Sequence, residues 1–211
     1  VMNILIIGTG KLGYEVYRRV AVMPQHHVTL LDHHRHEHDV SLATQLIGDA
    51  SNVDDLKRAL RGIDVVFSTV GITHAAQFAT ALVQAMDAVG VKRLFWTTQF
   101  QINYDQISEA MYTLAHREFG FSREVETTYV AGQKAGAAVI RNSDLDYTLL
   151  ACHFFKYNDE ADQLIVEPAG NAVSGGPLSL FSLATLITDM LEHPQDYPQR
   201  ELMISAWPGE K

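Results

Sequence analysis

A six-residue glycine motif near the amino terminus constrains the fold more than any other feature of this sequence. Residues 8–13 read Gly-Thr-Gly-Lys-Leu-Gly, between an apolar run at 2–7 and a segment with helical spacing of apolar residues at 11–23. In such a context the first glycine permits a tight turn, the second lets a pyrophosphate approach, and the third lets helix and strand pack closely. Free N–H groups of the first helical turn then face the phosphates. The motif predicts a dinucleotide site.

Apolar runs and helical patterns alternate along the rest of the chain. Strands are expected at 2–7, 27–32, 44–47, 64–69, 93–98 and 146–150, and helices at 11–23, 54–60, 76–89, 133–142 and 183–192. Strands that are apolar throughout and separated by helices indicate a parallel sheet covered on both faces. We therefore predict one α/β domain over residues 1–211, with a doubly wound, mostly parallel Rossmann sheet and helices on both faces.

Two segments, about 103–128 and 154–180, interrupt this alternation. The first is polar and aromatic and follows the fifth expected strand, and the second is interrupted by three glycines at 170, 175 and 176. Ligands of an open α/β sheet bind outside the carboxyl ends of its strands. We therefore expect both segments to be lid or substrate elements.

Charge, hydropathy and cysteine content limit the kinds of partner and the cellular location that we expect for this chain. The formal net charge is −9, so the chain has no basic footprint for nucleic acid. No stretch approaches the ~20 apolar residues of a membrane span, and the run at 1–7 is too short for a signal segment. The single cysteine, Cys152, cannot form an internal disulfide. We expect a cytoplasmic protein without a membrane partner, and a homodimer stays open.

An acidic residue after the second expected strand bears on the choice of cofactor. Asp32 follows the glycine motif by about 20 residues, where a carboxylate binds the adenosine ribose and repels a 2′-phosphate. This favours NAD. Arg35 keeps NADP open, because it can turn toward a 2′-phosphate.

A histidine-rich stretch surrounds Arg35. His34, His36 and His38 alternate as metal ligands on an extended strand would. The favoured interpretation is a solvated loop beside the adenosine pocket, and no metal site is expected.

Four further motifs carry a family resemblance: Gly48-Asp49 followed by Asp54, GIDVVF at 62–67, VKRL at 91–94 and SDLDYT at 143–148. Together with the glycine motif, they resemble the atypical short-chain dehydrogenase/reductases of the NmrA-like, NAD(P)-binding type. The resemblance implies that Asp49 and its neighbour Ala50 lie near the adenine ring. It also implies that the turn Thr69-Val70-Gly71 lines the cofactor groove, as the position of this turn after the fourth strand suggests independently.

The catalytic pair of that family is incomplete in this chain. Catalytic members use Tyr-x-x-x-Lys, in which the lysine holds the nicotinamide ribose and lowers the tyrosine pKa. Lys134 stands at the lysine position by its distance from the 143–148 motif, but Val130 occupies the tyrosine position. Tyr129 is one residue out of register, about 100° around a helix, and we expect it to be silent. Thr97 and Thr98 replace the usual serine.

Two residues after the sixth expected strand are further candidates. His153 follows that strand, where nicotinamide and substrate would meet, and a histidine can act as acid or base near neutral pH. A pocket-lining histidine is the favoured alternative. Cys152 is expected to be a small buried residue rather than a nucleophile.

The resulting candidate site has two parts. The catalytic candidates are Lys134, Thr98 and His153. The cofactor-binding candidates are Gly8, Thr9, Gly10, Lys11, Leu12, Gly13, Asp32, Arg35, Asp49, Ala50, Thr69, Val70, Gly71, Thr97 and Lys134.

Two functions follow from the resemblance and its departures. The first is an NAD(P)-dependent oxidoreductase acting on a small carbonyl or alcohol. The second is a non-catalytic NAD(P) redox sensor that signals to a protein partner, which the missing Tyr-x-x-x-Lys pair favours. A nucleotide-sugar epimerase or dehydratase is less favoured, because 211 residues leave little room for a substrate domain.

Overall fold

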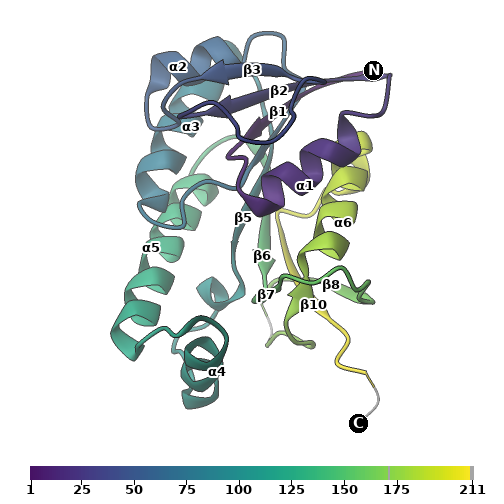
Figure 1. Cartoon of the computed structure of the whole chain (residues 1–211). Coiled ribbons are helices and arrows are strands. Elements are labelled where there is room, and N and C mark those ends of the chain that lie inside the picture. The colour runs from purple at the N-terminus through teal and green to yellow at the C-terminus, as the bar shows by residue number, and fades with distance from the viewer. Residues whose placement is uncertain (171, 210–211) are drawn as a thin grey trace.

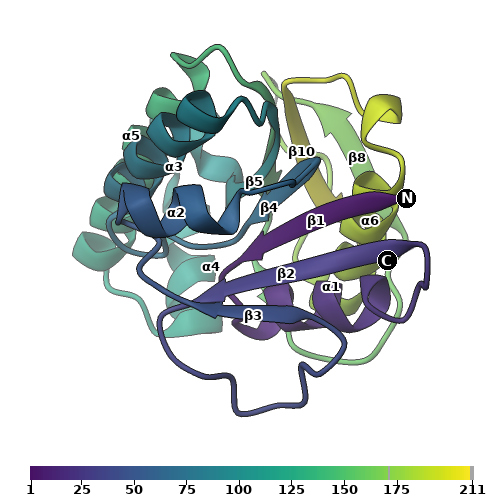
Figure 2. The same cartoon turned by 90° about the horizontal axis from the view of Figure 1, so that it is seen from above.

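The computed structural model describes residues 1–170 and 172–209. Its main sheet has eight strands in the order β3-β2-β1-β4-β5-β6-β10-β8 (Figures 1 and 2). The strands are β1 Met2–Ile7, β2 His26–Asp32, β3 Thr44–Ile47, β4 Val65–Ser68, β5 Arg93–Gln99, β6 Asp146–Cys152, β8 Leu164–Pro168 and β10 Glu201–Ala206, and β7 Phe155–Lys156 pairs with β9 Leu178–Ser179. All neighbours in the main sheet are parallel except β10 and β8.

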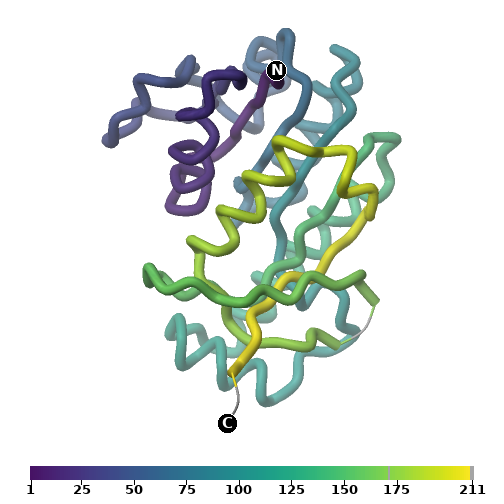
Figure 3. The backbone as a smooth tube through the Cα atoms, turned by 90° about the vertical axis from the view of Figure 1, so that its right-hand side faces the viewer, coloured from purple at the N-terminus to yellow at the C-terminus, as the bar shows by residue number. Residues whose placement is uncertain are grey.

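Six α-helices cover both faces of the sheet. They are α1 Lys11–Val20, α2 Val53–Ala59, α3 Ala75–Val89, α4 Glu109–Phe119, α5 Arg123–Arg141 and α6 Leu180–Glu192, with 3₁₀ turns at Phe100–Asn103 and Pro194–Asp196. Helices α1 and α6 lie on one face, and α2, α3 and α5 lie on the other (Figure 1). Figure 3 shows the first face toward the viewer, with α1 in purple and α6 in yellow-green. The predicted doubly wound Rossmann fold is confirmed.

The strand order places a crevice at the end of β1. From β1 the chain moves outward to β2 and β3 and then returns to β4 on the other side of β1. Connections on opposite sides diverge at this point, and ligands of doubly wound sheets bind there, outside the carboxyl ends of the strands. The glycine motif stands directly after β1, so the topology and the motif agree on the position of the site.

The segment 103–128, expected as a lid or substrate element, is mostly helical. It contains α4 and the first turns of α5, whose first residue, Arg123, lies ten residues before the expected start at 133. Ser108 and Ser122 accept hydrogen bonds from the backbone N–H groups of Met111 and Val125 and cap the two helices. The helical period is weak here because α4 buries only Ala115.

Two further differences concern the carboxyl-terminal third. The last helix begins at Leu180 rather than at 183, because Ser179 caps it through the Ser182 N–H group. Strand β10 was not predicted; it pairs in parallel with β6 and antiparallel with β8. In residues 1–170 and 172–209, no helix combines the length and apolar character that a membrane crossing needs.

Candidate active site

The three glycines of the motif differ in what surrounds them. Gly8 has a φ of 87°, and a Cβ there would lie 2.8 Å from the Val70 Cγ1 atom. A Cβ on Gly13 would lie 1.9 Å from the carbonyl oxygen of Gly8, so only glycine lets α1 start this close to β1. Gly10 has an ordinary φ of −62° and no atom within 4 Å of a built Cβ. Its open side is where a ligand can reach the backbone.

Asp32 ends β2 beside this turn. The Thr9 hydroxyl donates a hydrogen bond to one of its carboxylate oxygens. The other oxygen is buried and has no hydrogen-bond partner in the described residues. A buried acceptor without a donor is costly, and a ribose hydroxyl would supply the missing donor.

The histidine-rich stretch packs around the same turn. The His36 Nε2–H group donates to the Thr9 carbonyl oxygen at 2.9 Å, and its Nδ1 accepts from the His38 backbone N–H at 3.1 Å. The His36 ring stacks on Tyr14 with ring centroids 5.3 Å apart. Among residues 1–170 and 172–209, no group of three or more His, Cys, Asp or Glu side chains is placed to hold a metal ion.

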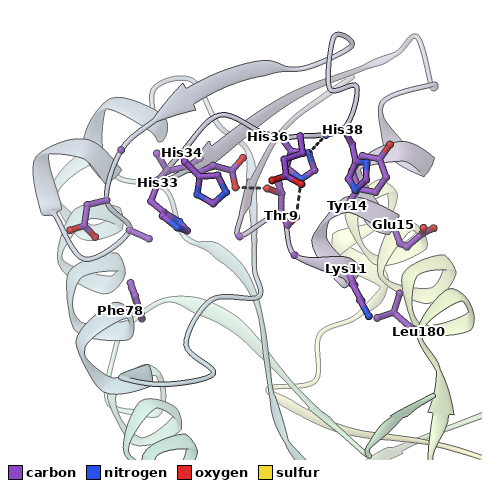
Figure 4. A pocket seen from close by; sticks show the side chains of 18 of the residues that line it. Thr9, Lys11, Tyr14, Glu15, His33, His34, His36, His38, Phe78 and Leu180 are labelled. Carbon is purple, nitrogen blue, oxygen red and sulfur yellow. Dashed lines mark hydrogen bonds between the residues drawn. The ribbon is translucent and has the colours of Figure 1, made fainter. Parts of the chain in front are cut away.

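A cavity of about 1140 Å³ extends from this turn along the ends of β1 and β2. Figure 4 shows His33 and His34 on one side of Thr9, and Tyr14 and His38 on the other. The expected cofactor residues that line it are Gly8, Thr9, Gly10, Lys11, Asp32, Asp49 and Ala50. Arg35 is exposed and does not line this cavity.

A second cavity, of about 380 Å³, continues from the first. The two share Gly10, Lys11, Tyr157 and Leu180. Its lining includes the expected residues Leu12, Thr69, Val70, Gly71, Thr97, Thr98 and His153. The segments 103–128 and 154–180 contribute aromatic walls, namely Phe119, Phe121, Phe154, Phe155 and Tyr157.

Gln133, rather than Lys134, points from α5 to this second cavity. The Gln133 Nε2 atom donates to the Gly71 carbonyl oxygen at 2.6 Å, and its Oε1 accepts from the Thr98 hydroxyl at 3.1 Å. Lys134 lines neither cavity, and its Nζ donates to the Tyr104 carbonyl oxygen at 2.6 Å. The placement of Lys134 at the nicotinamide therefore needs correction: α5 is rotated by one residue relative to the expected register.

The same rotation brings Tyr129 to the cavity wall. Tyr129 and Gln133 are four residues apart and lie on one face of α5, so the spacing of the family pair is kept with glutamine in place of lysine. Burial raises the pKa of Tyr129 to about 12, with a further contribution from the charge of Glu126. The phenol therefore keeps its proton at neutral pH. The expectation that Tyr129 points elsewhere is wrong.

His153 is buried in the wall of this cavity. Its ring stacks on Phe100 with centroids 4.3 Å apart, and its Nδ1 accepts the Phe154 backbone N–H at 2.7 Å. Burial lowers the pKa of His153 to about 4. The ring is therefore neutral near pH 7, with its proton on Nε2. It can donate a hydrogen bond there, but it does not supply the titration near neutral pH on which the acid/base interpretation depended.

Cys152 is fully enclosed beside it. Its thiol points to the Leu150 carbonyl oxygen at 3.4 Å, and burial raises the pKa of Cys152 to about 12. A thiol that stays protonated is a poor nucleophile, in line with a packing role.

The comparisons with known proteins assign the family. Residues 8–194 match the family model described as NAD(P)H-binding. The chain belongs to the NAD(P)H-binding family. This match confirms the cofactor class that the glycine motif predicted, an NAD(P) dinucleotide.

Solved structures share the fold over nearly the whole chain. A Rossmann-fold NAD(P)-binding family protein from Shigella flexneri has a TM-score of 0.80 and 23% identity, covering 100% of this chain and 97% of the other. A short-chain dehydrogenase/reductase from Veillonella parvula, in complex with NADP, has a TM-score of 0.81 and 19% identity, covering 99% and 95%. An anaerobilin reductase from Escherichia coli has a TM-score of 0.72 and 15% identity, covering 99% and 98%.

A curated relative matches a shorter region. The glutamyl-tRNA reductase of Methanothermobacter marburgensis is 38% identical over 92 residues, which are 43% of this chain and 22% of that protein. The chain thus spans about a fifth of the length of this curated relative.

The residues present fit the cofactor of the family. Gly10 leaves open space at the start of α1, the unpaired oxygen of Asp32 lacks a donor, and Lys11 lines both cavities. The first group suits a pyrophosphate, the second a ribose, and the third a negative charge between them.

Sequence reasoning missed Gln133 and discounted Tyr129. Their four-residue spacing was visible in the chain, but a glutamine four residues after a tyrosine carries no signal unless the helix register is known.

Proposed function

We propose that this protein is an NADH-dependent reductase of a small carbonyl compound, which binds in the second cavity. The observation that supports it best is the continuity of the two cavities, since a dinucleotide lying on Gly10 in the first would extend its nicotinamide into the second. The segments 103–128 and 154–180 act as substrate lids in this proposal, because they supply the aromatic walls.

The polar groups of the second cavity suit carbonyl reduction. When bound, the cofactor supplies a hydride. The Tyr129 hydroxyl and the His153 Nε2–H group are donors for the carbonyl oxygen, and the Tyr129 phenol is the group that can release a proton. Gln133 holds Thr98 and the turn at Gly71 in position.

The direction of the reaction follows from the state of Tyr129. Its raised pKa keeps the phenol protonated at neutral pH, so a proton is available for donation and the phenolate base is scarcely populated. Reduction needs a donor, whereas alcohol oxidation needs a base, so reduction is favoured.

NAD is the proposed cofactor rather than NADP. The buried, unpaired oxygen of Asp32 accepts a hydrogen bond from a free 2′-hydroxyl and repels a 2′-phosphate. Arg35 is exposed outside the cavity and is the group that would have to move for NADP. A homodimer and a cytoplasmic location stay predictions from the sequence.

A turnover screen tests the proposed function. Small aldehydes, ketones and quinones are mixed with NADH and the protein, and loss of the reduced nicotinamide fluorescence is followed. We expect turnover that the Tyr129→Phe variant loses. Tight NADH binding without turnover on any of these compounds contradicts the proposal.

A redox sensor is the second candidate. The observation that favours it is that Gln133 replaces a cation beside Tyr129, which leaves the phenol a weak acid. A sensor would bind its protein partner with different affinities in its NADH-bound and NAD⁺-bound forms. It would show no turnover in the same screen.

A further inference from the structure

Glu126 is a buried acid that the reaction proposed above does not use. It lies in the first turn of α5 and is 1% exposed. Neither carboxylate oxygen has a hydrogen-bond partner in residues 1–170 and 172–209. Carboxylates are almost never fully buried unless they are paired, so this position has a physical cost that the fold does not require.

Amide side chains connect this acid to the cavity. Gln101, in the 3₁₀ turn at Phe100–Asn103, is fully buried, and its Nε2 also lacks a partner in the described residues. The Gln101 Oε1 atom accepts from the Gln99 Nε2 at 3.1 Å, and Gln99 lines the second cavity. Gln101 also lies close enough to Glu126 to affect the pKa of the carboxyl group.

Tyr129 lies one helical turn from Glu126. The two are three residues apart, a spacing that makes them neighbours on a helix, and Tyr129 is half-buried at the cavity wall. Burial is the largest cause of the raised pKa of Tyr129, and Glu126 would add to it only in its ionised form. Burial in turn raises the pKa of Glu126 above its ordinary value, because an unpaired carboxylate loses its solvation there.

From this arrangement we propose that Glu126 is a positioning residue that stores a proton and returns it to Tyr129 after each reduction, with Gln101 beside it. The role rests on the proposed function. The carbonyl carbon gains hydride from NADH as its C=O π bond breaks, and the oxygen takes the Tyr129 hydroxyl proton. The phenolate then takes the Glu126 proton, and the carboxylate regains one from water. NADH is oxidised, the carbonyl is reduced, and the protein is unchanged.

Other titratable groups near this point do not duplicate the role. The other titratable groups on or near the amino-terminal half of α5 are Glu109, Tyr112, His116, Arg123, Cys152, His153 and Tyr157. Glu109 pairs with Arg123 at the surface. The pKa of Cys152 is raised to about 12 and that of His153 is lowered to about 4. The Lys134 Nζ atom is held by the Tyr104 carbonyl oxygen.

The first arm of the test uses the protein without cofactor. Infrared difference spectra compare the wild type with Glu126→Gln at pH 7. We expect a carboxylic acid C=O band that this substitution removes and that Glu124→Gln leaves in place, because Glu124 is an exposed acid of the same helix. A wild type without this band overturns the proposal.

The second arm uses turnover with NADH. Glu126→Gln should lower kcat by about 10-fold to 100-fold, less than the roughly 10²–10⁴ of a general acid in direct contact, while KM and the Kd for NADH stay unchanged. Glu126→Asp should restore part of kcat and its pH profile, because it keeps an acid at the position. Glu124→Gln should match the wild type.

The outcomes separate this role from the proposed function. A wild type that turns over while Glu126→Gln keeps the same kcat and pH profile overturns the role of Glu126 alone. A wild type that turns over no carbonyl compound overturns the proposed function, and the role of Glu126 with it.

Discussion

At the scale of single residues, the glycines of the turn after β1 separate binding from folding. Gly10 has an ordinary backbone and open space where a side chain would stand, whereas a Cβ on Gly13 would overlap the Gly8 carbonyl oxygen. We expect Gly10→Val to weaken NADH binding by at least about tenfold with little change in Tm, because the new side chain occupies the approach to the backbone. Gly13→Ala should instead lower Tm strongly. Fluorescence titration and thermal unfolding check both predictions. Full affinity for NADH in a folded Gly10→Val variant would mean that the turn at Gly10 does not hold the pyrophosphate.

The positions on α5 give a prediction about chemistry. Tyr129→Phe should lower kcat by about 10²–10⁴ because it removes the proposed donor. Lys134→Ala should change kcat little, since its Nζ binds the Tyr104 carbonyl outside both cavities. Steady-state kinetics with Tyr112→Phe as the control separate these effects. If Lys134→Ala were the inactive variant, α5 would present Lys134 rather than Gln133 to the cavity, as the family pattern predicts.

His153 gives a pH dependence of stability. Its pKa is about 4 in the fold and about 6.5 in the unfolded chain. Between these pH values His153 is protonated in the unfolded chain and neutral in the native state. The free energy of unfolding therefore falls as the pH decreases from 6.5 toward 4. From pH 7.5 to pH 5 the loss should be about 2 kcal/mol. Urea unfolding should show this loss in the wild type and in the exposed control His27→Gln, and a smaller one in His153→Gln. Equal losses in all three would contradict the burial argument.

At the scale of elements, two glycines of α5 report on its packing against α3. A Cβ on Gly136 would lie 2.7 Å from the Ala75 Cβ, whereas nothing lies within 4 Å at Gly132. Gly136→Ala should destabilise the protein by about 1–3 kcal/mol through overpacking. Gly132→Ala should stabilise it by about 0.5–1 kcal/mol through helix propensity. Chemical denaturation measures both, and equal effects would mean that the two helices do not touch at Gly136.

The helices of the first lid segment show how far an element can be predicted. Its serine caps are local signals, but α4 buries little, so the apolar period that identifies a helix is faint. The α5 register was equally hidden, because Val130 and Gln133 are both buried on the face toward the sheet. Packing against α3 and the 3₁₀ turn selected that face, and no local preference encodes it.

At the scale of the whole molecule, cofactor binding at the ends of β1, β2 and β4 should raise the free energy of unfolding of the whole chain. A ligand that binds only the folded protein stabilises it by about 2.7 kcal/mol at one hundred times its Kd, which raises Tm by about 5–10 °C for a chain of this size. We expect NADH to give this shift and an equal concentration of NADPH to give a smaller one. Thermal unfolding measures both shifts. A larger shift with NADPH would contradict the role of Asp32 and favour Arg35 as the phosphate ligand.

The sequence by itself determined the parts of this protein that depend on near neighbours in the chain. The glycine turn, the buried strands from β1 to β6 and the acid after β2 are local patterns, because turn geometry, strand burial and helix termini are specified within a few residues. The tertiary structure decided the rest. It rotated α5 so that Tyr129 and Gln133 face the cavity, recruited β10 between β6 and β8, and buried His153 and Glu126. Those outcomes depend on which distant surfaces pack together, and desolvation by such packing sets the protonation of the site.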